Sequence, residues 1–293
     1  MENENKEKFI CFNGEFLSVN EPNINVNNRG FHFGDTCFET IRAINGKTWC
    51  LDVHLARLYE GMRMVKMIKP VYFTYGYFEK LINELLGKNG FDKGARVRLT
   101  VVRKSGGAYT PISNEVDFVL ESYPISDNDF TINEEGVSVE LYPEMKKKVD
   151  KLSPYKLGNS MLYVMGAIWA KENNLDDALL QNYKLGIIES TNSNLFIVSN
   201  GVLYTPAIED GCLGGTMRMH IINLALEYKI KVYECNITPS NLLVADEIFL
   251  TNAIQGIKWV SSYKNKRYFN NTAKKLVEYL NLKVEKANLA LSF

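Results

Sequence analysis

The sequence lacks an excess of charge of either sign, because 34 lysine and arginine residues balance 34 aspartate and glutamate residues. Without such an excess, no long-range field favours nucleic acid or an anionic membrane as a partner. Long apolar runs are also absent: residues 1–8 are polar, and no stretch approaches the length of a membrane span. We therefore expect neither a nucleic-acid nor a membrane partner.

Cysteine is scarce and follows no recognisable pattern. The five cysteines are odd in number, scattered and free of any C-x-x-C pair: Cys11, Cys37, Cys50, Cys212 and Cys235. Such spacing does not indicate a disulfide framework or a cysteine metal site. The sequence therefore predicts reduced thiols, a cytoplasmic location and no bound metal.

The residues that are present describe an ordinary globular protein, with 46% hydrophobic and 23% charged residues. A chain of 293 residues allows one large domain or two moderate ones. The polar passage at residues 124–136 is the best candidate for a linker. We therefore expect a small α+β domain at residues 1–123 and a larger domain at residues 137–293.

Short strands bounded by turn residues dominate the predicted secondary structure. Asn13-Gly14, Asn45-Gly46 and Asn200-Gly201 each predict a hairpin. Residues 20–35 predict a loop, whereas Asp52 is expected to be the N-cap of one helix and Thr74 the start of another. Further strands are expected at residues 95–103, 116–122, 178–181, 186–189, 231–236 and 247–251, and further helices at residues 216–228 and 274–282. This mixture predicts an α+β fold.

A single lysine, Lys156, is the first candidate for chemistry. The Ser153-Pro154 turn delivers it to the start of a helix that is apolar from Met161 onward. Further along the chain, Glu189 ends an apolar strand and the glycine-rich residues 211–216 open another helix. A nucleophilic lysine, a buried acid and the backbone amides of a helix start are what a pyridoxal phosphate enzyme requires. Spacing alone leaves other interpretations open.

A basic run, Lys146-Lys147-Lys148, precedes this lysine, and Lys151 lies close by. Runs of like charge usually form a solvated face, and that is the prediction for this run. The alternative is that it attracts an anion.

Several passages follow one another along the chain: residues 29–42 (RGFHFGDTCFETIR), 54–58 (HLARL), Lys156 with Asn159, Glu189 with 194–196 (NLF), 213–218 (LGGTMR) and 247–253 (EIFLTNA). Their order and content resemble the fold type IV pyridoxal phosphate enzymes, the class IV aminotransferase family. That family includes branched-chain aminotransferases, D-amino acid aminotransferase and 4-amino-4-deoxychorismate lyase. Any one passage is weak, but the series covers residues 9–260 and is specific as a whole.

The resemblance implies roles for the matching residues. Lys156 resembles the Schiff-base lysine, which also moves the proton at the substrate carbon. Glu189 resembles the acid that pairs with the protonated pyridine nitrogen, and Arg57 the arginine that binds the phosphate. The plain alternatives are a surface lysine at a helix start, a solvent-facing carboxylate at a strand end and a surface arginine.

The remaining implied contacts come from loops and helix starts. Gly215 and Thr216 resemble phosphate-binding residues at a helix N-terminus, although an ordinary glycine turn is the alternative. Asn252 and Ala253, which follow a strand, are also expected to bind the cofactor. His32 and Tyr109 would fall on the substrate side, and for His32 a satisfied loop residue is an equal alternative.

The resemblance also implies an architecture and an assembly. It implies a small, α/β sandwich-like N-terminal domain and a larger C-terminal domain with a pseudo-barrel that anchors pyridoxal 5'-phosphate. It further implies a homodimer whose sites lie near the subunit interface, acting on a small-molecule amino substrate.

Within the family, the motifs favour the lyase. Asn159 lies three residues after the lysine, as in the lyases and the D-amino acid enzymes, and Thr251-Asn252-Ala253 resembles the lyase turn. Residues 103–109 resemble the glycine-rich loop of the lyase, but its arginine is missing. The first hypothesis is therefore a lyase that releases pyruvate and 4-aminobenzoate, a folate precursor, from 4-amino-4-deoxychorismate.

Two alternatives stay open. One is an aminotransferase of branched-chain or D-amino acid type, which moves the amine onto a 2-oxo acid. The other is a non-catalytic homologue that binds coenzyme or protein only, against which the presence of both Lys156 and Glu189 argues.

Overall fold

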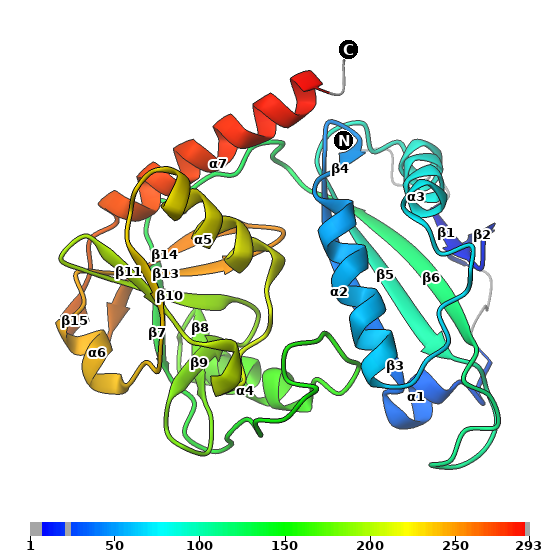
Figure 1. Ribbon diagram of the computed structural model, residues 1–293, viewed down its shortest axis with the longest axis horizontal. Coiled ribbons are helices and arrows are strands. Elements are labelled where there is room, and N and C mark those ends of the chain that lie inside the picture. Colours follow the sequence, from blue (N-terminus) through cyan, green and yellow to red (C-terminus); the bar gives the residue numbers. More distant parts are fainter. Residues whose placement is uncertain (1–7, 21–24, 291–293) are drawn as a thin grey trace. The chain divides into compact units, whose positions relative to one another are not determined.

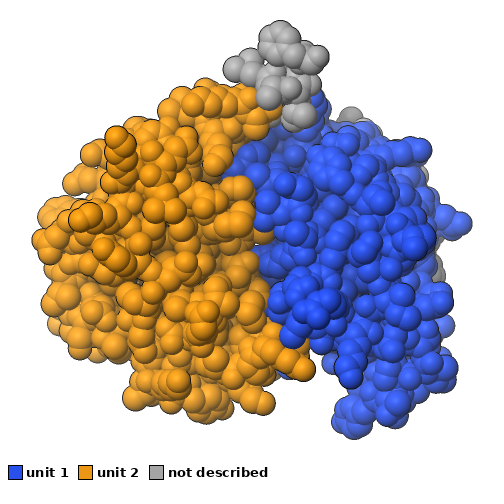
Figure 2. Space-filling model, in the orientation of Figure 1, with its two compact units in different colours: residues 1–128, 155–159 blue, residues 129–154, 160–293 orange. Residues whose placement is uncertain are grey.

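The computed structural model describes residues 8–20 and 25–290, with side chains up to residue 287. The chain forms two compact units, drawn in blue and orange in Figure 2. Unit 1 comprises residues 1–128 and 155–159, and unit 2 comprises residues 129–154 and 160–293. The segment Tyr155–Asn159 thus belongs to unit 1, whereas the sequence predicts that all of residues 137–293 form the second domain.

Unit 1 is built on a six-stranded antiparallel sheet with the strand order β2-β1-β6-β5-β3-β4. Its strands are β1 (Phe9–Phe12), β2 (Glu15–Ser18), β3 (Thr36–Ile44), β4 (Lys47–Thr48), β5 (Ala95–Arg103) and β6 (Val116–Pro124). Helices α2 (Leu51–Met64) and α3 (Tyr75–Asn89) cover one face of this sheet (Figure 1). The predicted hairpins at Asn13-Gly14 and Asn45-Gly46 are confirmed.

The core of unit 1 lies between this sheet and the two helices. Alternate residues of β5, namely Val97, Leu99 and Val101, pack with apolar residues of the helices, because successive strand residues point to opposite faces. The intervening residues Arg96 and Arg98 lie on the other face.

Two helix starts in unit 1 differ from the prediction, and one confirms it. Residues 29–33, predicted as loop, form the short helix α1 (Arg29–Phe33), because the Asn28 side chain accepts from the amides of Gly30 and Phe31; residues 21–24 of that passage lie outside the described part. Asp52 is not the N-cap of α2: Cys50 occupies that position, and Asp52 lies in the first turn. Thr74 caps α3 by accepting from the amide of Tyr77, as predicted.

Unit 2 contains a nine-stranded sheet. Its strands are β7 (Val137–Leu141), β8 (Asp177–Gln181), β9 (Ile187–Ser190), β10 (Asn194–Ser199), β11 (Val202–Thr205), β12 (Val232–Glu234), β13 (Glu247–Asn252), β14 (Gly256–Tyr263) and β15 (Lys266–Arg267). Strands β10, β13, β14, β7, β8 and β9 pair in that order, and β9 pairs again with β10, so these six strands close a ring. The ring confirms the expected pseudo-barrel and the α+β class.

Helices surround the ring of unit 2 (Figure 1): α4 (Met161–Glu172), the 3₁₀ helix η1 (Ile208–Asp210), α5 (Thr216–Glu227), α6 (Pro239–Val244) and α7 (Asn271–Ala290). The two faces of β8 pack into different hydrophobic clusters. Leu179 packs with Ile187 and Leu195, whereas Leu180 packs against α4. Strands β8, β9, β10 and β13 are consequently buried along almost their whole length.

The predicted linker is packed rather than free. Residues 125–136 contain no helix or strand, but Phe130 is 1% exposed and its amide donates to Asn281 of α7. Among residues 8–20 and 25–290, no helix has an apolar stretch long enough to cross a membrane.

Candidate active site

Lys156 is held by backbone pairing along the edge of β3 in unit 1. The amide of Phe38 donates to the Lys156 carbonyl at 3.0 Å, and the amide of Gly158 donates to the Thr36 carbonyl at 2.9 Å. A Cβ at Gly158 would lie 2.3 Å from Thr36 Oγ1, so only glycine allows this close approach. The backbone of the lysine is therefore fixed, and its half-buried side chain begins at a defined point before α4.

The Lys156 amine shares an aromatic neighbour with a second cation. Its Nζ lies 4.8 Å from the centre of the Phe38 ring, and the guanidinium of Arg98 lies 4.0 Å from the same centre. Arg98 pairs across the sheet with Thr40, two residues beyond Phe38 on the same face of β3. Arg98 thus contributes a positive charge to the face of β3 that carries Phe38. No motif in the sequence singles out Arg98, although the alternation Arg96-Val97-Arg98-Leu99 is a visible signal of a charged strand face.

Arg57 is not a surface residue. Its side chain is 12% exposed, and its guanidinium forms two hydrogen bonds with Glu39 on the helix side of β3. Nε donates to Oε1 at 2.8 Å and Nη2 donates to Oε2 at 2.5 Å. His54 Nδ1 lies 2.7 Å from the same Oε2. Burial alone would raise the pKa of Glu39, but Arg57 and then His54 hold it at about 2. Glu39 therefore fixes the orientation of the arginine fork.

Glu189 is buried in unit 2 and accepts three hydrogen bonds. It is 2% exposed on β9, which excludes the solvent-facing alternative. Lys147 Nζ donates to its Oε1 at 2.6 Å and the Tyr163 hydroxyl donates to the same atom at 2.8 Å. The Leu213 amide donates to Oε2 at 2.7 Å. Burial and the neighbouring Glu189 raise the pKa of Tyr163 above its ordinary value, so this hydroxyl stays a neutral donor.

The interpretation of the basic run as a solvated face is wrong for its first two lysines. The Lys147 side chain is only 11% exposed, because it reaches Glu189, and Lys146 Nζ donates to the Gln181 side chain at 2.7 Å. Lys148 and Lys151 are exposed as predicted. Charge clustering in the sequence cannot reveal this, since the partner Glu189 is 42 positions away.

Gly215 and Thr216 form the start of α5, next to Glu189. No side chain caps this helix, and its first turn contains no acidic residue. The Asn194 side chain donates to the Leu213 carbonyl at 2.8 Å, and a Cβ at Gly215 would lie 1.8 Å from Asn194 Oδ1. The glycine is therefore required for the loop to pass Asn194. An uncapped helix N-terminus of this kind favours an anion.

Asn252 lies at the end of β13, near the turn that follows Glu189. Its Nδ2 donates to Ser193 Oγ at 3.0 Å, and its Oδ1 accepts from the amides of Ile254 and Gln255. Ala253 lies in the same turn. In the preceding residue, the buried Thr251 Oγ1 has no hydrogen-bond partner among the described residues.

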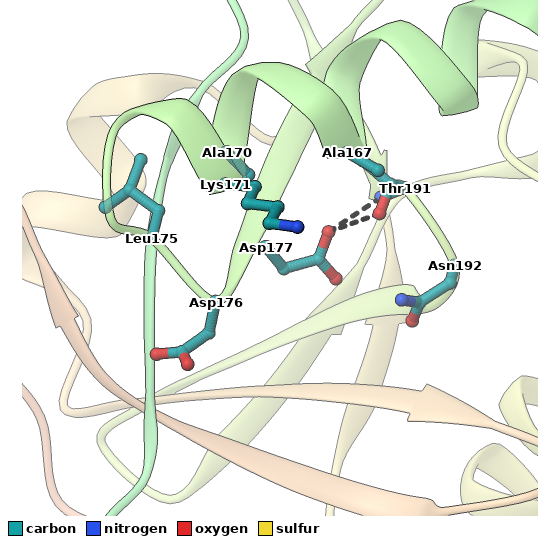
Figure 3. A pocket seen from close by; sticks show the side chains of 8 residues that line it. All are labelled: Ala167, Ala170, Lys171, Leu175, Asp176, Asp177, Thr191 and Asn192. Carbon is teal, nitrogen blue, oxygen red and sulfur yellow. Dashed lines mark hydrogen bonds between the residues drawn. The ribbon is translucent and has the colours of Figure 1, made fainter.

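The turn between β9 and β10 is hydrogen-bonded to a buried aspartate, Asp177. Asp177 Oδ1 accepts from the Thr191 amide at 3.2 Å and from Thr191 Oγ1 at 2.5 Å (Figure 3). These residues line a pocket of about 390 Å³ together with Ala167, Ala170, Lys171, Leu175, Asp176 and Asn192. None of the candidate site residues lines this pocket. The hydrogen bonds between Asp177 and Thr191 fix the turn that follows Glu189.

The two residues predicted on the substrate side are exposed on unit 1. His32 lies on α1, and Tyr109 is 91% exposed with its ring 5.6 Å from that of Phe33. The loop that carries Tyr109 is nonetheless anchored to α1. Arg29 of α1 donates to the Asp35 side chain and to the carbonyls of Gly106, Gly107 and Ala108.

The structure thus brings the sequence-predicted residues into two groups. Lys156 and Arg57 are bound to neighbouring residues of β3 in unit 1. Glu189, Gly215, Thr216 and Asn252 are linked in unit 2 through Leu213, Asn194 and Ser193. His32 and Tyr109 belong to neither network of hydrogen bonds.

Proteins of similar sequence are named as aminotransferases. A protein from Methanocaldococcus jannaschii, whose name assigns it to the branched-chain-amino-acid aminotransferases, is 31% identical over 83% of each chain. A D-alanine aminotransferase from Listeria innocua is 27% identical over 83% of each chain.

Solved structures share the fold. The branched-chain aminotransferase from Thermoproteus uzoniensis has a TM-score of 0.86 at 23% identity, covering 93% of both chains. A Legionella pneumophila structure named as a 4-amino-4-deoxychorismate lyase has a TM-score of 0.82 at 25% identity, covering 90% of this chain and 96% of the other.

The family described as amino-transferase class IV matches residues 36–263, more than three quarters of the sequence, which confirms the resemblance. The chain therefore belongs to the class IV aminotransferase family of pyridoxal phosphate-dependent enzymes.

Proposed function

We propose that this enzyme is an amino acid aminotransferase that moves an amino group onto a 2-oxo acid. The observation that carries this choice is the 31% identity, over 83% of both chains, with a protein named as a branched-chain-amino-acid aminotransferase. The D-alanine aminotransferase at 27% identity supports the same reaction type with the other stereochemistry. The amino donor is thus of branched-chain or D-amino acid type, and aminotransfer replaces the lyase as the first hypothesis.

The residues present fit pyridoxal phosphate. The protein offers a backbone-fixed amine at Lys156, a buried carboxylate at Glu189 and an uncapped helix start at Gly215. The coenzyme supplies an aldehyde that condenses with amines and a ring that withdraws electrons from the substrate carbon. These three groups match its aldehyde, its ring nitrogen and its phosphate.

Each residue then has a task that its surroundings permit. Lys156 would hold the coenzyme through its amine and move the proton at the substrate α-carbon. Glu189 would face the ring nitrogen, and the amides at Gly215 and Thr216 would bind the phosphate. The resemblance also assigns Arg57, whose fork Glu39 orients, to the phosphate. Asn252 shapes the turn beside these amides, with Ala253 next to it.

Arg98 is the residue that we assign to the substrate carboxylate. Amino acids and 2-oxo acids share a carboxylate next to the reacting carbon, and an arginine that contacts the same ring as the candidate nucleophile is suited to bind it. The side chain of Arg98 is 40% exposed and its nearest carboxylate, Glu121, is 4.0 Å away, so a second anion can approach it.

The lyase is the second candidate. It is favoured by Asn159, by the Thr251-Asn252-Ala253 turn and by the Legionella pneumophila structure at 25% identity. The lyase releases pyruvate without an acceptor, whereas an aminotransferase converts its coenzyme with donor alone and then requires a 2-oxo acid.

Incubation of the purified enzyme with a branched-chain amino acid or D-alanine is expected to convert the coenzyme to its amine form, and 2-oxoglutarate is expected to restore the aldehyde form. Absorbance spectra and amino acid analysis measure both steps. In Lys156→Ala, borohydride should no longer fix coenzyme to the protein, and turnover should fall to background. Steady pyruvate release from 4-amino-4-deoxychorismate, with no response to amino donors, would establish the lyase instead.

Arg98→Met is expected to raise the KM for the 2-oxo acid by roughly 10- to 100-fold, because one charge-assisted pair to the carboxylate is lost. Initial rates over a range of acceptor concentrations measure this. Arg96→Met is the matched control, since Arg96 stacks on Tyr123 instead of Phe38. Equal effects of the two substitutions would contradict the assignment.

Glu39→Gln is expected to lower the free energy of unfolding by about 3 kcal/mol at pH 7, because Arg57 and His54 lose their buried partner. The pKa of Glu39 is lower in the folded protein than its ordinary value of 4.5, so its charged form stabilises the fold at pH values above 4.5. This contribution is lost as the pH falls towards 2. Urea unfolding at pH 7 and at pH 3 should therefore show a smaller difference between the two proteins at pH 3. Glu60→Gln breaks an exposed ion pair on α2, the helix that carries His54 and Arg57. This substitution should leave the urea midpoint unchanged.

We also propose a cytoplasmic homodimer. Its support is the group of exposed apolar side chains on unit 1, with Phe31 at 76%, Tyr109 at 91% and Ile112 at 81% exposure, together with five free thiols. Exposed patches of this kind are often covered by a partner. Sedimentation equilibrium is expected to give twice the chain mass, and Ile112→Lys should weaken the dimer; a monomer at all concentrations would refute it.

A further inference from the structure

Lys147 connects the buried acid to the chain segment that leads to Lys156. Its Nζ donates to Glu189 Oε1 at 2.6 Å and to the Ser153 carbonyl at 3.3 Å. Its backbone is pinned as well, because its amide donates to the Gln181 carbonyl at 2.8 Å. A buried lysine held at both ends is not an accidental surface contact.

The other groups that face Glu189 are neutral. Tyr163 is a protonated hydroxyl, and burial, opposed by Arg218, raises the pKa of the neighbouring Cys212 thiol to about 12. The third donor is the Leu213 backbone amide. Within the described part of the chain, Lys147 is thus the one cation that is hydrogen-bonded to Glu189.

A carboxylate at 2% exposure is costly to keep charged unless a cation and good donors compensate for its lost hydration. Neutral donors alone stabilise the charge less than a paired ammonium does. We propose that Lys147 is a positioning residue that keeps Glu189 an oriented carboxylate before the coenzyme arrives.

The geometry divides the two carboxylate oxygens between two tasks. Lys147 and Tyr163 donate to Oε1, whereas among the described residues Oε2 receives only the Leu213 amide. Oε2 therefore has the capacity to accept a further donor, and Lys147 fixes which oxygen this is. This assignment rests on the proposed role of Glu189 towards the ring nitrogen, but it does not depend on whether the reaction is aminotransfer or elimination.

The test is infrared spectroscopy of the full-length, coenzyme-free protein at neutral pH. Lys147→Met should show the carbonyl band of a protonated carboxyl group that the unchanged protein lacks. The band should vanish in the double variant Lys147→Met, Glu189→Gln, which assigns it to Glu189. Lys147→Arg, which restores the cation, should not show the band. Its absence from Lys147→Met would overturn the proposal.

The matched control is Lys146→Met. It removes an equal charge one residue away, but the Lys146 amine bonds Gln181 and not Glu189, so no band is expected. If Lys147→Met does not fold, as judged by circular dichroism, Lys147→Gln replaces it, because a glutamine keeps a donor and removes only the charge. A band in Lys146→Met would overturn the specific role of Lys147.

Coenzyme titration separates this proposal from the proposed function. Followed by absorbance, the dissociation constant for pyridoxal phosphate should rise roughly tenfold in Lys147→Met and less than about twofold in Lys147→Arg and Lys146→Met. If Glu189→Gln binds coenzyme normally and retains turnover, the role of Glu189 is wrong. If Glu189→Gln loses them but Lys147→Met behaves as the unchanged protein, only the role of Lys147 is wrong.

Discussion

The burial of the Glu189 carboxylate is the constraint on which the surrounding part of unit 2 depends. An acid that is 2% exposed must gather donors from elsewhere in the chain. It obtains them from the segment between β7 and α4, from α4 itself and from the loop before α5. The same loop presents the amides at Gly215. Satisfying one carboxylate therefore also places the helix start that is suited to a phosphate.

Unit 1 applies the same principle to a second acid. Glu39 occupies a core-facing position of β3 that an apolar residue would normally fill. It is tolerated because α2 places His54 and Arg57 one turn apart, directly on it. The adjacent Phe38 points to the other face of the strand, where Lys156 and Arg98 lie. A single strand thus positions Arg57 on one face and the Lys156 amine on the other.

The parts of the site that sequence could predict are those with a local signature. The turn before Lys156, the apolar strand that ends in Glu189 and the glycine pair before Thr216 each depend on neighbouring residues, and the structure shows these elements. The roles of Lys147, Arg98 and Glu39 depend on partners that are distant in sequence. A lysine in a basic run looks solvated until its carboxylate partner is known, and a helix cap such as Asn28 is hidden when the surrounding polar residues suggest a loop.

The same distinction explains why the reaction is harder to read than the coenzyme. The groups proposed for the coenzyme are at least partly buried, and the close approach of Gly215 to Asn194 leaves no room for a side chain there. His32 and Tyr109, predicted on the substrate side, are exposed and lie outside these networks. Packing therefore constrains the residues proposed for the coenzyme, whereas it leaves exposed the two residues predicted on the substrate side. A motif in such a loop, like the glycine-rich residues 103–109, is weaker grounds for the reaction than identity spread over 83% of the chain.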